Sequence, residues 1–121
     1  MNYSIGKFAE LSGFSIDTLR YYEKESLIIP KRDANNRRVF TEQDIIWMDF
    51  IKKLKLTGMK LKDIKVYAQL RYQGDETISE RLELLLKQAT ILLEQKNEID
   101  NHLDFLQKKI RIYKEMLAEK K

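Results

Sequence analysis

The sequence predicts a mainly α-helical fold in two parts, a small helical domain over residues 1–74 and one long C-terminal helix over residues 75–121. Three observations lead to this prediction. The first part contains four short stretches with helical spacing of apolar residues, separated by breaks rich in Gly, Asn and Thr. Residues 77–121 contain neither Gly nor Pro. The same residues place an apolar side chain at alternating intervals of three and four, which is the pattern of a coiled coil.

The composition is that of a folded helical protein rather than a disordered one, with 43% hydrophobic and 35% charged residues and a single proline. No apolar run approaches the ~20 residues of a membrane span, and the start lacks the pattern of a secretory signal. We therefore expect a cytoplasmic protein that does not contact a membrane. The chain has no cysteine, which excludes disulfides, thiolate metal sites and thiol redox chemistry. We expect no metal and no cofactor.

Positive charge is concentrated in the first part of the chain. Residues 1–74 hold 14 Lys and Arg against 9 Asp and Glu, whereas residues 75–121 hold 9 against 10. A basic excess confined to one domain indicates a polyanionic partner such as nucleic acid. A basic surface that is merely solvated explains the same numbers, so charge alone does not decide.

Two short helices with a tight turn between them open the chain. Ser4 is the predicted N-cap of the first helix, and Gly13 ends it. Ser15 caps the second helix, whose apolar residues Ile16 and Leu19 mark the inward side. This layout predicts a helix-turn-helix.

The outward side of the second helix suits contacts with phosphates and base edges. Asp17, Thr18 and Tyr21 point away from the apolar side, with Arg20 and Tyr22 on the flanks. For Tyr22 the alternative is packing on a neighbouring helix. Glu23 falls on the inward side, and the pattern offers no role for it there.

A hairpin, which we call the wing, follows over residues 30–40. The pair Asn35-Asn36 favours a turn, and Val39 and Phe40 favour extended chain. Four basic residues lie in the wing, namely Lys31, Arg32, Arg37 and Arg38.

Two further helices complete the domain. Thr41 and Asp44 form a predicted capping box at the start of the third helix. Residues 57–58 break it, and a fourth helix follows with Leu61, Ile64 and Ala68 inward. Residues 52–65 contain six lysines and one acid, a second basic patch.

The C-terminal segment opens with a predicted capping box, Thr77 and Glu80, and carries a heptad seam that needs a partner helix. The seam positions are Ile78, Leu82, Leu85, Ala89, Leu92, Lys96, Ile99, Leu103, Leu106, Ile110, Tyr113 and Leu117. The simplest partner is a second copy of the chain. Antiparallel pairing about a midpoint between Asn97 and Glu98 keeps the two Lys96 charges apart, although registers shifted by a heptad fit almost as well.

Four segments resemble the MerR family of transcriptional regulators. They are residues 3–9 (YSIGKFA), 18–23 (TLRYYE), 37–41 (RRVFT) and 55–64 (KLTGMKLKDI). The resemblance implies a winged helix-turn-helix domain with its second helix in the major groove, followed by an antiparallel coiled-coil dimer. It also implies an inverted-repeat promoter operator, bending and untwisting of that DNA in response to a signal, and RNA polymerase as a partner.

The predicted DNA-contacting residues are Ser15, Asp17, Thr18, Arg20, Tyr21, Tyr22, Arg37, Arg38 and Lys60. The resemblance assigns Tyr22 to the DNA backbone, the two arginines to the wing and Lys60 to a phosphate. The chain departs from the family pattern at Ser26, where glycine is common, and at residues 36–38, where Gly-Tyr-Arg is common.

An enzyme is the least supported class of protein. The only histidine, His102, lies in the coiled-coil segment, and the sequence has no Ser/His/Asp set, phosphate-binding glycine loop or metal-ligand cluster. A coiled-coil adaptor is the competitor from another class, and it leaves the basic N-terminal region unexplained. Among DNA-binding functions, a repressor or architectural role without promoter realignment remains an alternative.

Overall fold

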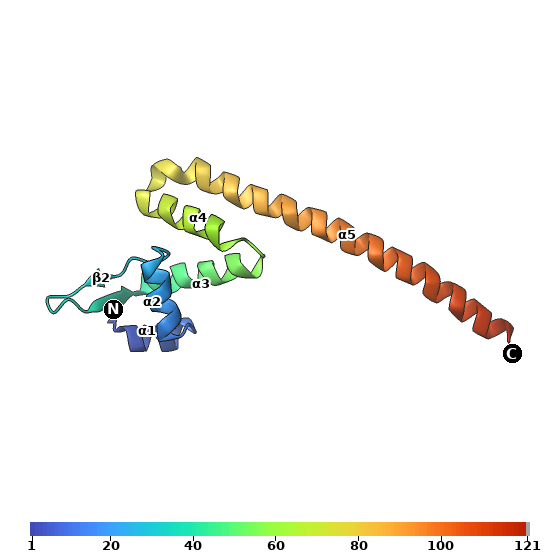
Figure 1. The fold of residues 1–121 in the computed structure, drawn as a ribbon, viewed down its shortest axis with the longest axis horizontal. Coiled ribbons are helices and arrows are strands. Elements are labelled where there is room, and N and C mark those ends of the chain that lie inside the picture. The colour runs from blue at the N-terminus through green and yellow to red at the C-terminus, as the bar shows by residue number, and fades with distance from the viewer. Residues whose placement is uncertain (121) are drawn as a thin grey trace. The chain divides into compact units, whose positions relative to one another are not determined.

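The computed structural model describes residues 1–120, which form five α-helices and short strands (Figure 1). The helices are α1 (Ile5–Ser12), α2 (Ile16–Lys24), α3 (Glu42–Leu56), α4 (Leu61–Gln73) and α5 (Ile78–Glu119). The strands are β1 (Asn2–Tyr3), β2 (Lys31–Arg32) and β3 (Arg38–Thr41), and a 3-10 turn, η1 (Asp75–Thr77), precedes α5. The predicted mainly α fold is confirmed.

The chain divides into two compact units, Met1–Leu85 and Leu86–Lys121. The first, which we call the N-terminal unit, continues past the predicted boundary at residue 74. It does so because Leu84 and Leu85, in the first turns of α5, pack against its core.

The predicted capping box at the start of the long helix is wrong. Thr77 is buried at 3% exposure and ends η1 rather than capping α5 with its side chain. Its hydroxyl lies 2.6 Å from the Leu70 carbonyl and 2.8 Å from the Gly74 carbonyl. These are carbonyls at the end of α4, so Thr77 secures the junction between the two helices.

The helix-turn-helix forms as predicted. The hydroxyls of Ser4 and Ser15 accept the backbone N–H groups of Lys7 and Thr18, at 3.3 and 3.0 Å. Gly13 ends α1 with φ +79°, a left-handed conformation that glycine adopts without steric cost.

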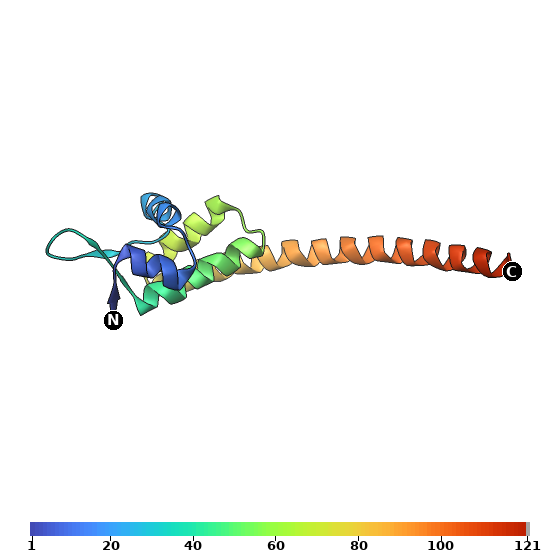
Figure 2. The ribbon, with the colours of Figure 1, turned by 90° about the horizontal axis from the view of Figure 1, so that it is seen from below.

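The wing is an antiparallel hairpin in which Lys31 pairs with Val39 and Arg32 with Arg38. Asn36 occupies the left-handed region at φ +59°, as the predicted turn requires. The sequence did not predict β1, which is two residues long and adds to the other edge of β3. Figures 1 and 2 show the hairpin loop projecting away from the helices of the N-terminal unit.

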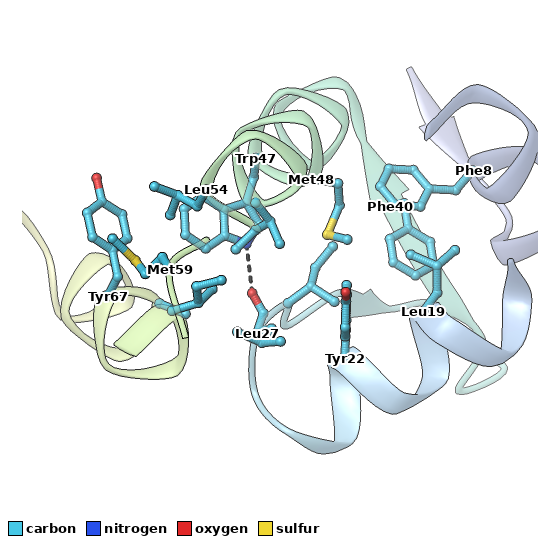
Figure 3. Packing of buried hydrophobic residues seen from close by; sticks show 14 residues of the cluster. Phe8, Leu19, Tyr22, Leu27, Phe40, Trp47, Met48, Leu54, Met59 and Tyr67 are labelled. Atoms are coloured by element: carbon cyan, nitrogen blue, oxygen red, sulfur yellow. Dashed lines mark hydrogen bonds between the residues drawn. The ribbon is translucent and has the colours of Figure 1, made fainter. Parts of the chain in front are cut away.

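One core joins the helices α1 to α4, the strands β1 and β3, and the start of α5 (Figure 3). The Phe8 and Phe40 rings stack with centroids 4.3 Å apart, joining α1 to the sheet. The Trp47 indole in α3 donates a 2.7 Å hydrogen bond to the Leu27 carbonyl, in the loop between α2 and the wing. This core buries almost completely the side chains of Leu19, Met48, Ile51, Ile64 and Ala68.

Two residues predicted to face inward lie at the edge of the core instead. Ile16 and Leu61 are each 37% exposed. Each is the first residue of its helix, where neighbouring turns cover a side chain on one side only. The predicted capping box of Thr41 and Asp44 is present at the start of α3.

Candidate nucleic-acid interface

The outward face of α2 carries polar and aromatic side chains in solvent. Asp17, Arg20 and Lys24 are exposed, and Tyr21 is 45% exposed. Thr18 is half-buried, and its hydroxyl oxygen accepts a 2.8 Å hydrogen bond from the Ser15 hydroxyl. The side of α2 that faces solvent is therefore the one that the spacing of its apolar residues predicted.

Tyr22 corrects the prediction that it lies on an exposed flank. It is 3% exposed, because its position three residues after Leu19 puts it on the buried side of the helix. The Tyr22 and Phe14 rings pack in an edge-to-face arrangement with their centroids 5.6 Å apart. The Tyr22 hydroxyl accepts a 2.7 Å hydrogen bond from the Lys55 ammonium. The structure therefore supports the alternative prediction for Tyr22, which was packing on a neighbouring helix.

Glu23 joins α2 to the wing. Its carboxylate accepts hydrogen bonds from Arg32, at 2.7 Å, and from Arg38. These ion pairs are only partly exposed, and they set two wing arginines at the edge of the outward face. Sequence reasoning missed this role, although an acid on the inward side of α2 beside four wing cations was a usable signal.

The wing tip is held by its one acid. The Asp33 side chain accepts the backbone N–H groups of Asn35 and Arg37, both at 2.9 Å. The Arg37 side chain stays exposed at this tip. An aspartate that bonds to the backbone in this way fixes a loop without neutralising the neighbouring arginine.

Three of the six lysines in the second basic patch bind the helix-turn-helix, namely Lys52, Lys55 and Lys65. Lys65 lies 2.7 Å from the Glu25 carboxylate, and Lys52 donates to the Ser12 carbonyl at 3.1 Å. The Lys65 ammonium, through its hydrogen bond and its charge, holds the pKa of Glu25 below its ordinary value of 4.5. The same hydrogen bond raises the pKa of Lys65. Lys52 thus joins α3 to the end of α1, whereas Lys55 and Lys65 join α3 and α4 to α2 and its C-cap.

Lys60 stands apart from that group. It is exposed and occupies the N-cap position of α4, where no side chain caps the backbone N–H groups. The free N–H groups and the positive end of the helix dipole favour an anion at such a terminus. Lys62, two residues further, is exposed as well.

Over residues 1–120, no group of three or more His, Asp or Glu side chains is placed to hold a metal ion. Within the same residues, no helix is long and apolar enough to cross a membrane.

The seam of α5 is left open in the single chain. Its large apolar members from Leu92 onward are between 39% and 67% exposed. They are Leu92, Ile99, Leu103, Leu106, Ile110, Tyr113 and Leu117. Ala89 and Lys96 are exposed too, whereas Leu85 is half-buried against the core of its own unit. Exposed apolar surface of this extent marks an interaction site.

Comparison with known proteins agrees with this geometry. The model of the MerR helix-turn-helix family of regulatory proteins matches residues 3–70. An uncharacterised helix-turn-helix transcriptional regulator of Haemophilus influenzae is 41% identical over 120 residues, covering 98% of this chain and 88% of its own length. Another from Bacillus subtilis, YyaN, is 37% identical, with 97% and 94% covered.

Solved structures are similar over nearly the whole chain. The crystal structure of HiNmlR, described as a MerR family regulator lacking the sensor domain and bound to promoter DNA, is 41% identical with a TM-score of 0.76. It covers 98% of this chain and 94% of its own. A putative MerR family regulator from Listeria monocytogenes is 33% identical with a TM-score of 0.78, covering 92% and 85%.

The fold and the exposed face of α2 thus define a winged helix-turn-helix regulator rather than an enzyme. The chain belongs to the MerR family of transcriptional regulators.

Proposed function

We propose that this chain binds an inverted-repeat promoter operator in duplex DNA as a homodimer and regulates transcription there. The observation that carries the proposal is the exposed outward face of α2. Ion pairs and lysine contacts on the other side of this helix hold it against the wing, α3 and α4. A recognition surface needs side chains that stay in place when DNA arrives, and these contacts supply that support. The DNA-bound HiNmlR structure supports the same reading.

Roles follow from where each side chain lies. Arg20 and Tyr21 project from the middle of α2 and read base edges in the major groove. Arg37 and Arg38 contact the DNA backbone from the wing, and Lys60 binds a phosphate at the start of α4. Ser15 and Thr18 contribute hydroxyls, with Asp17 beside them at the N-terminal end of the helix. Tyr22 acts through its hydroxyl, which Lys55 already holds.

The test is binding to promoter DNA under controlled salt. Fragments selected from genomic DNA by the purified chain provide the operator, and fluorescence anisotropy measures affinity for it and for random duplex. We expect tight, sequence-dependent binding whose log affinity falls with log salt by about 0.9 for each phosphate contact. Equal affinity for both duplexes contradicts sequence-specific recognition, and binding without salt dependence contradicts the phosphate contacts. No binding to either duplex favours a coiled-coil adaptor.

We further propose that α5 forms the dimer by antiparallel pairing about a point between Asn97 and Glu98. Leu82 then faces Tyr113, Leu85 faces Ile110 and Lys96 faces Ile99. A parallel pair sets the two Lys96 ammonium groups opposite each other inside the seam. Antiparallel pairing separates them and brings each within reach of the other chain's Glu98 or Asp100.

Engineered thiols test the direction cleanly because the chain has no cysteine. Leu82→Cys mixed with Tyr113→Cys should form a disulfide, which needs Cα atoms within ~7 Å. Leu82→Cys alone should not, because antiparallel chains hold its two copies about 46 Å apart. Efficient crosslinking of Leu82→Cys with itself in a dilute DNA-binding dimer means that the chains run parallel.

At the promoter, the dimer bends and untwists the operator and so changes how RNA polymerase meets it. A signal acts by changing which DNA shape the dimer favours. Transcription in a purified system, with and without the chain, distinguishes promoter realignment from simple repression. A higher transcript level supports realignment of the promoter. A lower or unchanged level supports a repressor or an architectural protein.

A further inference from the structure

We propose that Asp17 reads a cytosine in the major groove and disfavours thymine at that position of each half-site. The inference rests on the sequence-specific DNA binding proposed above, and it deepens that proposal by assigning one base preference to one side chain. An acid on a surface that binds a polyanion repels every phosphate it approaches. A contact with a base that offers a hydrogen-bond donor gives this acid a role there.

The position of Asp17 on α2 suits a base contact. It lies in the first turn, two residues after the N-cap Ser15. Asp17 is exposed, as is Arg20, which follows three residues later. At about 100° per residue, the two side chains lie within about 60° of each other on the outward face. In a helix-turn-helix, the N-terminal residues of the second helix are the ones that reach base edges.

Neither of these two side chains is engaged within the protein. Over residues 1–120, Asp17 and Arg20 form no ion pair with each other or with any other side chain. The nearby hydroxyls, by contrast, bond to each other. The Ser15 hydroxyl donates to the Thr18 hydroxyl at 2.8 Å and accepts the Thr18 N–H at 3.0 Å. The carboxylate of Asp17 therefore keeps its full capacity to accept hydrogen bonds from DNA.

The chemistry of the base edges selects the partner of this carboxylate. An ionised carboxylate accepts hydrogen bonds and cannot donate them. In the major groove cytosine offers the N4 amino donor, whereas thymine offers the O4 acceptor. Guanine offers two acceptors, and adenine offers an amino donor beside the N7 acceptor. Asp17 thus attracts cytosine, attracts adenine less, and repels thymine and guanine.

Arg20 locates the cytosine within the half-site. A guanidinium only donates, and its preferred partner in the major groove is guanine, through O6 and N7. Three residues place Arg20 about 4.5 Å from Asp17 along the helix. That distance is close to the step between base pairs, which is about 3.4 Å. We therefore expect the cytosine on a base pair next to the guanine that Arg20 contacts.

A role at the helix terminus is the alternative for Asp17. An acid in the first turn stabilises a helix through the helix dipole. That role needs only a negative charge, so it predicts a change in stability without a change in base preference. Measuring both quantities on the same variants separates the two roles.

The experiment measures base preference for full-length wild type, Asp17→Ala, Asp17→Asn and Asp49→Asn. Each position of the selected operator is changed to every base pair, in both half-sites together, and anisotropy competition gives the relative affinities. Asp49 is an exposed acid on α3. Its replacement is a matched control that removes the same charge outside α2. Urea unfolding of each protein measures the stability that Asp17 contributes.

We expect wild type and Asp49→Asn to prefer cytosine over thymine about tenfold at one position, the factor typical of a hydrogen bond to a charged group. Asp17→Ala should bind all four bases there with similar affinity. Asp17→Asn should prefer adenine, because an asparagine amide pairs with the N6 and N7 atoms of that base. The guanine preference assigned to Arg20 should persist in every protein.

An unchanged cytosine preference in Asp17→Ala overturns the proposal, as does an equal gain in affinity for all sequences. Either result leaves Asp17 as a surface or helix-terminus charge, while the sequence-specific binding proposed above stands. If Asp17→Ala loses the guanine preference too, Asp17→Asn decides, since a switch to adenine supports the contact and its absence overturns it. Equal binding of wild type to all duplexes overturns both the sequence-specific recognition and this inference.

Discussion

The Arg38 guanidinium on β3 donates a hydrogen bond to the Glu23 carboxylate on α2. Through it, a wing cation and the recognition helix share one acidic residue, which also binds Arg32. The wing is therefore positioned by the same helix whose outward face is proposed to read the DNA, and a change at Glu23 should alter both.

Replacement of Glu23 by Gln should lower discrimination between operator and random duplex by about tenfold. That factor corresponds to the ~1.5 kcal/mol typical of a hydrogen bond to a charged group. Glu10→Gln is the matched control, because it removes one negative charge from an exposed site on α1. Fluorescence anisotropy on both duplexes measures the ratio, and an equal effect of the two variants contradicts a positioning role for Glu23.

Arg20→Ala should weaken operator binding by about 1–3 kcal/mol and change random-duplex binding much less, since a base contact carries sequence information. Lys60→Ala removes the same charge from α4 and is the comparison. It should weaken binding to both duplexes and flatten the salt slope by about one unit. If Arg20→Ala also weakens both duplexes equally, Arg20 is a backbone contact.

The pair of Lys65 and Glu25 predicts acid-sensitive stability. The folded state holds the pKa of Glu25 below 4.5, so the stability it contributes is present above pH 4.5 and is lost as pH falls through the lowered pKa. Glu25→Gln should therefore reduce the loss of stability on acidification, as measured by urea unfolding at a series of pH values. In a Lys65→Met background the same substitution should change this pH dependence little, and an undiminished effect there contradicts the pairing.

Ser26→Gly should stabilise the chain by about 1 kcal/mol, because Ser26 has φ +61° and a left-handed conformation is costly for any residue with a Cβ. Urea unfolding measures the change. Ser79→Gly, in the first turn of α5, is the control and should destabilise by a comparable amount. A loss of stability on Ser26→Gly contradicts the argument from backbone strain.

The sequence predicted most of the fold because its signals are local. Ser4, Gly13 and Ser15 specify the helix-turn-helix through caps that span three or four residues, and Asn36 specifies the wing turn. Apolar spacing alone found the long seam of α5. The predicted cap at Thr77 failed because its hydroxyl bonds to carbonyls of the preceding helix, and only the folded chain brings those groups together.

The candidate site was predicted less completely, for a related reason. The outward direction of Arg20 and Tyr21 follows from helical periodicity. The partners of Glu23, Lys55 and Lys65 lie between 9 and 40 residues away in the sequence. Nothing in a local pattern assigns such pairs, so these supporting residues became visible only with the fold.

The indole of Trp47 holds the Leu27 carbonyl at the junction between α2 and the wing. With that joint fixed to α3, the recognition helix, the wing and the start of α4 turn together as one rigid body. In the proposed dimer, a signal that alters DNA twist acts on the angle between two such bodies rather than on the shape of either. In that proposed dimer, the paired α5 helices transmit torque between the two N-terminal units, and each unit keeps its internal structure while it binds half of the proposed operator.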